Sequence, residues 1–142
     1  MPESGGLGIG QIVWSPIAQG VLTGKYKQGA AVPEGSRATE TSWGANFVAR
    51  WLNDPVLAAV EKLEPIAKDM DLTMSQLAIA WVLSNPNVSA AIVGASRPEQ
   101  ITENAKAAGV TLPEDVLSGI DYALGDLVST DPALTVSPEI RP

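Results

Sequence analysis

Two short apolar runs, separated by a helix-rich stretch, constrain the fold of this chain more than any other feature. Residues 12–14 (Ile-Val-Trp) stop at Ser15-Pro16, and residues 88–93 stop at Gly94. Short apolar runs bounded by turn residues are typical of buried strands. Strands joined by a long helical crossover run parallel. We therefore expect an α/β protein with two short parallel strands. Because parallel strands normally lie in larger, doubly covered sheets, we expect these two to be part of something larger.

Capping signals place about five helices around these strands. Asp54 is a favourable cap residue before a proline, and Pro65 should kink or divide the helix that begins there. Thr73 and Gln76 match a capping box that opens another helix. The expected helices cover residues 54–67, 73–84, 96–108 and 113–124, with the first divided by Pro65. Residues 15–46 lack periodicity and are expected to form a long, functional loop.

Composition excludes several classes of site. The chain has 142 residues, 45% of them apolar, which suffices for one domain. Its net charge of −7 argues against a nucleic-acid partner or a membrane surface. It contains no cysteine and no histidine, so no metal site is expected. No apolar run approaches the roughly 20 residues of a membrane span, and the start lacks signal-peptide features, so we expect a cytoplasmic protein.

The exit from the second strand has the residues of an anion site. The first N–H groups of a helix lack internal partners and carry partial positive charge. Gly94 allows close approach of the backbone, Ser96 adds a hydroxyl, and Arg97 adds a fork of donors suited to phosphate. The alternative is a plain turn, in which Ser96 and Glu99 form a capping box and Arg97 is a surface residue.

Further polar residues could complete such a site. Gln100, Glu103 and Asn104 share one helix face and could bind an adenine and its ribose. The first strand also ends in a loop with Gly20 and Lys25. In barrels of eight βα units, the loops after the last two strands often bind phosphate.

The two strand exits together resemble a known family. The stretches IVWSPIAQGVLTGKY (residues 12–26) and AAIVGASRPEQITENAKAAGV (residues 90–110) resemble the last two strand-end motifs of the aldo-keto reductases. The branch resembled is that of potassium-channel β-subunits and bacterial NADP-dependent aldehyde or sugar reductases. The resemblance implies the C-terminal part of a (β/α)8 TIM barrel, present here as an incomplete barrel. It divides the chain into a flexible leader (1–7), an NADP-binding reductase segment (8–125) and an extended, proline-containing tail (126–142).

The resemblance also implies a set of cofactor contacts for NADP(H). Trp14 would stack on the nicotinamide, residues 15–18 and Gly20 would line the pyrophosphate, and Lys25 and Arg37 would meet phosphate charge. The residues so implied are Trp14, Ser15, Pro16, Ile17, Ala18, Gly20, Lys25, Arg37, Gly94, Ser96, Arg97, Gln100, Glu103 and Asn104.

The second motif would distinguish the two nicotinamide cofactors. Gly94, Ser96 and Arg97 would take the 2′-phosphate, which implies NADP rather than NAD, and the polar helix face beyond them would hold the adenosine.

The resemblance implies carbonyl reduction by hydride transfer, but no catalytic residue is assigned to this chain. The family uses a tyrosine tuned by a lysine and an aspartate, with a histidine, all from the first half of the barrel. Tyr26 does not match the catalytic tyrosine, and there is no histidine. We expect an inactive C-terminal fragment that self-associates or binds the missing N-terminal half of the barrel. The alternatives are a non-catalytic nucleotide-binding or assembly module and a truncated product without independent activity.

Overall fold

The computed structural model describes residues 2–41 and 43–129, and it confirms an α/β fold with two parallel strands. Seven α-helices lie within the described residues, two more than expected. The elements are α1 (Pro2–Gly6), β1 (Gln11–Trp14), α2 (Trp43–Ala49), α3 (Asp54–Glu61), α4 (Leu63–Asp69), α5 (Met74–Leu83), β2 (Val88–Ile92), α6 (Pro98–Ala105) and α7 (Glu114–Leu124). Three 3₁₀ turns are η1 (Ala18–Thr23), η2 (Arg37–Thr39) and η3 (Gly125–Leu127).

The two strands form one parallel sheet whose carboxyl ends are level. Trp14 lies opposite Ile92 at these ends. The register shifts after Gln11, so that Ser89 has no opposite residue on β1. A side chain at Gly10 would overlap the Ser89 hydroxyl, so the glycine leaves room for this irregularity. The level carboxyl ends bring both strand exits to one rim of the molecule.

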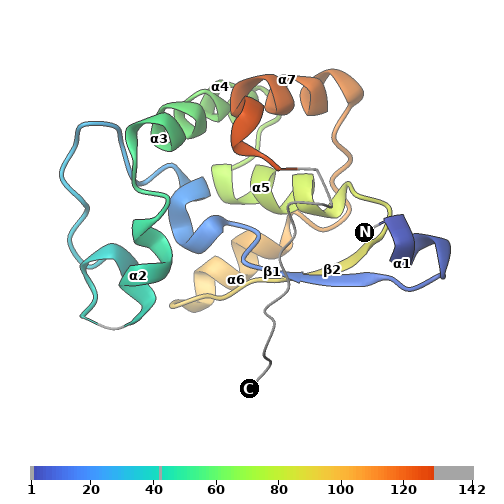
Figure 1. Ribbon diagram of the computed structural model, residues 1–142, viewed down its shortest axis with the longest axis horizontal. Helices are drawn as coiled ribbons and strands as arrows, with labels where there is room; N and C mark the ends of the chain where they lie inside the picture. The colour runs from blue at the N-terminus through green and yellow to red at the C-terminus, as the bar shows by residue number, and fades with distance from the viewer. Residues whose placement is uncertain (1, 42, 130–142) are drawn as a thin grey trace.

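Helix α5 covers one face of the sheet, and α3, α4 and α7 lie on the side of α5 that faces away from the sheet (Figure 1). It contacts β2 on one side and α4 on the other, while α7 packs on α3 and α4. The capping box expected at Thr73 and Gln76 is present and opens α5. The core between α4, α5 and α7 consists of Leu63, Ala67, Leu77, Ala80, Leu112, Ile120 and Ala123.

The helix expected at residues 54–67 is divided, but not at the proline. The break falls at Lys62, and Pro65 lies in the first turn of α4. Proline is tolerated there because the first N–H groups of a helix have no internal partner. The cap of α3 is also one residue earlier than expected, since the Asn53 side chain accepts from the Val56 N–H at 3.2 Å.

The long loop expected at residues 15–46 holds more structure than its sequence predicts. It contains η1, η2 and the start of α2. A second core forms around this segment from Val21, Tyr26, Val48, Leu57 and Val60. Because the apolar residues of this segment belong to short turns, their spacing follows neither the helical nor the strand period.

The expectation that both strands are buried is wrong for one face of the sheet. Ile12, Trp14 and Ile92 are 67%, 64% and 60% exposed. Val13 and Ala91 alternate with them and are half-buried. The strand exits are therefore bordered by an uncovered apolar surface, here called the open face (Ile12, Trp14 and Ile92).

At the N-terminal end, part of the expected leader forms a short helix. Residues 2–6 form α1, and Asn87 donates to the Ser4 hydroxyl at 2.9 Å, which ties α1 to the turn before β2. The expected tail lies outside the described residues from position 130 onward. Among the helices of the described part, none has the length and apolar character needed to cross a membrane.

Candidate functional site

The exits of β1 and β2 line one hollow of about 530 Å³. Ser15 and Ser96, which follow the two strands, both contribute to its wall. Parallel strands place their carboxyl ends at the same edge, which explains how residues 81 positions apart come together. Helix α6 lies toward this end of the sheet (Figure 1), and its residues Gln100 and Asn104 also line the hollow.

Most of the expected cofactor residues lie in this hollow. From the first strand exit and the loop that follows come Trp14, Ser15, Pro16, Ile17, Gly20, Lys25 and Arg37. From the second exit and α6 come Gly94, Ser96, Gln100 and Asn104.

Three expected residues lie elsewhere. Arg97 and Glu103 line an adjoining hollow, which shares Ser75, Gln100 and Asn104 with the first. Ala18 packs against the second core instead. The structure thus divides the expected residues of the second motif between two connected hollows.

The chain after β1 turns tightly, through left-handed backbone conformations. Ser15, Ala18 and Gln19 have φ values of 56°, 47° and 59°, which are uncommon for residues other than glycine. Such conformations persist where the surrounding structure fixes them, often at functional sites. Gly20 has φ of 98°, and a Cβ there would lie 3.1 Å from Cε and Nζ of Lys25. The missing side chain of Gly20 therefore lets the lysine fold over this turn, 5.1 Å above the ring of Tyr26.

Gln19 is a functional candidate that the sequence analysis missed. Its side-chain amide donates to the Ser15 hydroxyl and accepts from the Arg37 guanidinium. The residue thus links two expected cofactor contacts from different segments. An amide between Ala18 and Gly20 in the first motif was the available signal, since only an amide both donates and accepts. Other lining residues that were not expected are Thr23, Gly35, Glu40, Ser75, Ile92 and Ala95.

The start of α6 differs from the capping box expected at Ser96 and Glu99. The N-cap is Arg97, and Pro98 is the first helical residue. The side-chain oxygen of Gln100 accepts from the N–H of Ser96 at 2.8 Å and from the N–H of Arg97 at 3.3 Å. It also accepts from the Ser96 hydroxyl at 3.2 Å. Because Pro98 has no N–H, the free donors lie upstream of it, where Gln100 reaches them and Glu99 does not.

The two tyrosines lie away from the hollow. Tyr26 is buried and Tyr122 is exposed on α7, and neither lines the hollow. Within the described residues no group of three or more acidic side chains could hold a metal.

The chemistry of the hollow suits an anion with a flat aromatic group. Lys25 and Arg37 supply positive charge, and Ser15 and Ser96 supply hydroxyl donors. Trp14 presents an indole that is 64% exposed, so one ring face is available for stacking. A phosphorylated nucleotide matches this combination of cations, hydroxyls and an aromatic surface.

Comparison of the whole sequence with known proteins gives the same relation. Residues 4–124 match the Aldo/keto reductase family. A protein named as a probable voltage-gated potassium channel subunit beta from Arabidopsis thaliana is 52% identical over 103 residues, covering 72% of this chain and 31% of that protein. Its counterpart from Oryza sativa subsp. japonica is 48% identical over 103 residues, with the same coverage.

A more distant relative extends the match. A protein named as a putative voltage-gated potassium channel subunit beta from Schizosaccharomyces pombe is 45% identical over 123 residues, covering 82% of this chain and 34% of that protein. The chain therefore spans about a third of the length of these relatives. With a family match over most of its residues and relatives 45–52% identical to it, this chain belongs to the aldo/keto reductase family.

Proposed function

We propose that this chain supplies the NADP(H)-binding part of an aldo/keto reductase that reduces carbonyl compounds. The observation that carries the proposal is the single hollow shared by both strand exits, which collects all expected cofactor residues except Ala18, Arg97 and Glu103. In this proposal the fold is the C-terminal part of a (β/α)8 barrel, and the hollow lies at the carboxyl ends of its last two strands.

The residues of the first exit would hold the nicotinamide and pyrophosphate end. Trp14 would stack on the nicotinamide ring, and the tight turn after Ser15 would turn hydroxyl and backbone donors toward the pyrophosphate. Lys25 and Arg37 would balance its charge, with Gln19 orienting the guanidinium. When bound, the cofactor supplies the hydride for carbonyl reduction.

The second exit would hold the adenosine end. In the structure, Gln100 accepts from the donors at Ser96 and Arg97. A 2′-phosphate would compete for the same donors, and its greater charge would favour it. Arg97 is exposed beside these donors, so its guanidinium can turn to meet the phosphate without losing a buried contact.

The open face is where we propose that the rest of the barrel packs. Parallel sheets are normally covered on both faces, and the relatives contain about three times the length of this chain. The acid groups of the family reaction would come from that part. Self-association through the same face is the other arrangement that would cover Ile12, Trp14 and Ile92.

The names of the relatives favour one second candidate. They are called subunits of voltage-gated potassium channels. The chain could therefore serve as a nucleotide-binding module within a larger assembly, with binding of NADP(H) but without turnover.

The proposed cofactor site is tested by the discrimination between NADPH and NADH. Replacing Arg97 (Arg97→Ala) should weaken NADPH binding by about 10- to 100-fold, the range expected for lost hydrogen bonds to a charged group, and leave NADH nearly unchanged. Isothermal titration calorimetry measures both affinities. Lys68→Ala, an exposed cation on α4 outside the hollow, is the control.

Equal losses for the two cofactors would reject the assignment of the 2′-phosphate to Arg97. Failure of the unmodified chain to bind either cofactor would reject a site formed by this chain alone.

A further inference from the structure

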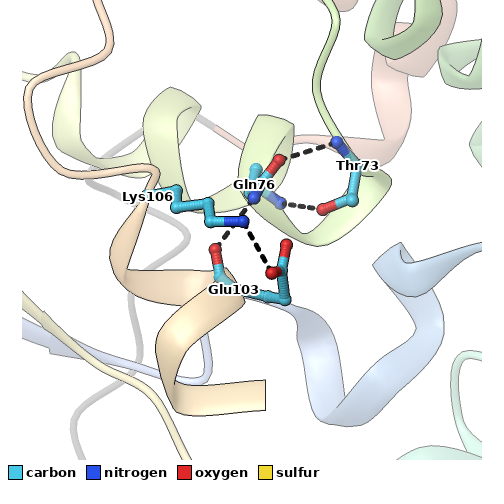
Figure 2. A network of polar contacts seen from close by, with 4 residues as sticks. All are labelled: Thr73, Gln76, Glu103 and Lys106. Atoms are coloured by element: carbon cyan, nitrogen blue, oxygen red, sulfur yellow. Dashed lines mark hydrogen bonds and ion pairs between the residues drawn. The ribbon is translucent and has the colours of Figure 1, made fainter. Parts of the chain in front are cut away.

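The buried side chain of Gln76, in the first turn of α5, hydrogen-bonds both the cap residue of α5 and the backbone of α6. It is 5% exposed. Its side-chain oxygen accepts from the Thr73 N–H at 2.9 Å, and its side-chain nitrogen donates to the main-chain carbonyl of Glu103 at 2.8 Å. Figure 2 shows the residue between the start of α5 and the end of α6, with Lys106 pairing separately with the Glu103 carboxylate. Both polar atoms of the buried amide are therefore satisfied.

The second of these bonds exceeds what a capping box requires. A capping box needs only an acceptor at the third helical position, so glutamate would serve as well as glutamine. Only glutamine also has a donor, and here that donor reaches a different helix. The carbonyl that it meets belongs to the last turn of α6, where it otherwise accepts only a long bond of 3.3 Å from the Lys106 N–H among the described residues.

Helix α6 itself has few buried contacts, and the chain is buried only just after it, at Ala107. It contains no buried residue, and Ile101 on it is 63% exposed. Apart from bonds within its own ends, the hydrogen bond from Gln76 is the one that ties α6 to another element among the described residues. Because apolar burial does not fix this helix, a single buried hydrogen bond has more influence on its position than it would in a core helix.

The two helices that Gln76 joins are the two walls of the proposed adenosine site. Ser75 on α5 lines both hollows, and so do Gln100 and Asn104 on α6. Gln76 itself lines neither. Its effect on a ligand would therefore act through the spacing of the walls.

We propose that Gln76 is a positioning residue for the nucleotide site, holding α6 against α5 so that the polar face of α6 meets the adenosine phosphate. This inference rests on the proposed function. It deepens that proposal by naming a residue that touches no ligand and yet sets the affinity for the adenosine end of the cofactor.

Two substitutions separate the bond to α6 from the cap of α5. Gln76→Glu keeps the acceptor for Thr73 and loses the donor to Glu103, whereas Gln76→Met loses both. Asn53→Ala removes a comparable cap from α3, none of whose residues lines either hollow, and controls for general loss of stability.

Hydrogen exchange followed by mass spectrometry reports on the helices directly. Amides of α6 should exchange faster in both Gln76 variants, and amides in the first turn of α5 should exchange faster in Gln76→Met alone. Asn53→Ala should leave α6 unchanged. Unchanged exchange in α6 of Gln76→Glu, or an equal increase in Asn53→Ala, would overturn the inference.

Binding of 2′,5′-ADP tests the consequence for the site. Both Gln76 variants should bind it about three- to tenfold more weakly, the ratio corresponding to one hydrogen bond, while Asn53→Ala should bind it normally. A normal affinity in both Gln76 variants would contradict the positioning role. If the unmodified chain does not bind 2′,5′-ADP, the proposed function fails and the ligand part of the inference with it, while the exchange data still decide whether Gln76 holds α6.

Discussion

The helical side of the sheet and its open face differ in how completely they are buried. On the helical side, Leu77 and Ala80 of α5 are 2% and 0% exposed. On the open face, Ile12 and Trp14 keep about two-thirds of their surface in contact with solvent. Both regions are apolar in sequence, so apolar character alone does not decide burial here.

The difference assigns separate roles to the two regions. The contacts that hold the fold together lie between α5 and the helices packed on it, where apolar surface leaves water. The proposed site lies at the rim where the sheet and α6 meet, next to the open face. Changes in the first region should therefore affect stability, and changes in the second should affect association and ligand binding.

The largest expected effect comes from the core. Leu77→Ala should lower the free energy of unfolding by about 2–5 kcal/mol, because it removes buried methyl groups and leaves a cavity. Ile12→Ala, on the open face, should change it by less than about 0.5 kcal/mol. Urea unfolding followed by circular dichroism measures both. Similar losses for the two variants would show that the open face is buried in solution.

A smaller effect is expected when charge is placed on the open face. If this face mediates self-association, Ile12→Lys and Ile92→Lys should each raise the dissociation constant by about tenfold or more, since burying an unpaired ammonium is costly. Sedimentation velocity over a concentration series measures this. Tyr122→Lys is the control, because Tyr122 is 89% exposed on α7. Association that is unaffected by the first two variants would place the contact elsewhere.

The sequence predicted which helices and strands form better than it predicted their exact boundaries and the contacts between them. Thr73 and Gln76 specify a local cap, so the start of α5 could be placed from four residues. The start of α6 depends on which nearby side chain reaches a free N–H, and the sequence offers both Glu99 and Gln100 there. The break at Lys62 has no side-chain cap, so no capping residue marks it in the sequence. The contact from Gln76 to Glu103 joins residues 27 positions apart, and local patterns carry no information about it.

The same holds for the site: residues within the local motifs were predicted, and a residue whose role depends on a distant contact was not. The strand-exit motifs named most residues that line the hollow, because the parallel pairing of two strands was enough to bring them together. Gln19 was missed because its role depends on Arg37, which reaches it from a loop without periodicity. Trp14 was expected to stack on the nicotinamide, and its 64% exposure could not be predicted because it depends on what covers the open face.

The most direct test of the account is a nuclear magnetic resonance titration of the ¹⁵N-labelled chain with NADPH. The amide signals of Ser15 and Gly20, after the first strand, and of Gly94 and Ser96, after the second, should shift together with one common dissociation constant. Shifts at only one of the two exits, or shifts confined to residues outside the hollow, would contradict a single nucleotide site built from both.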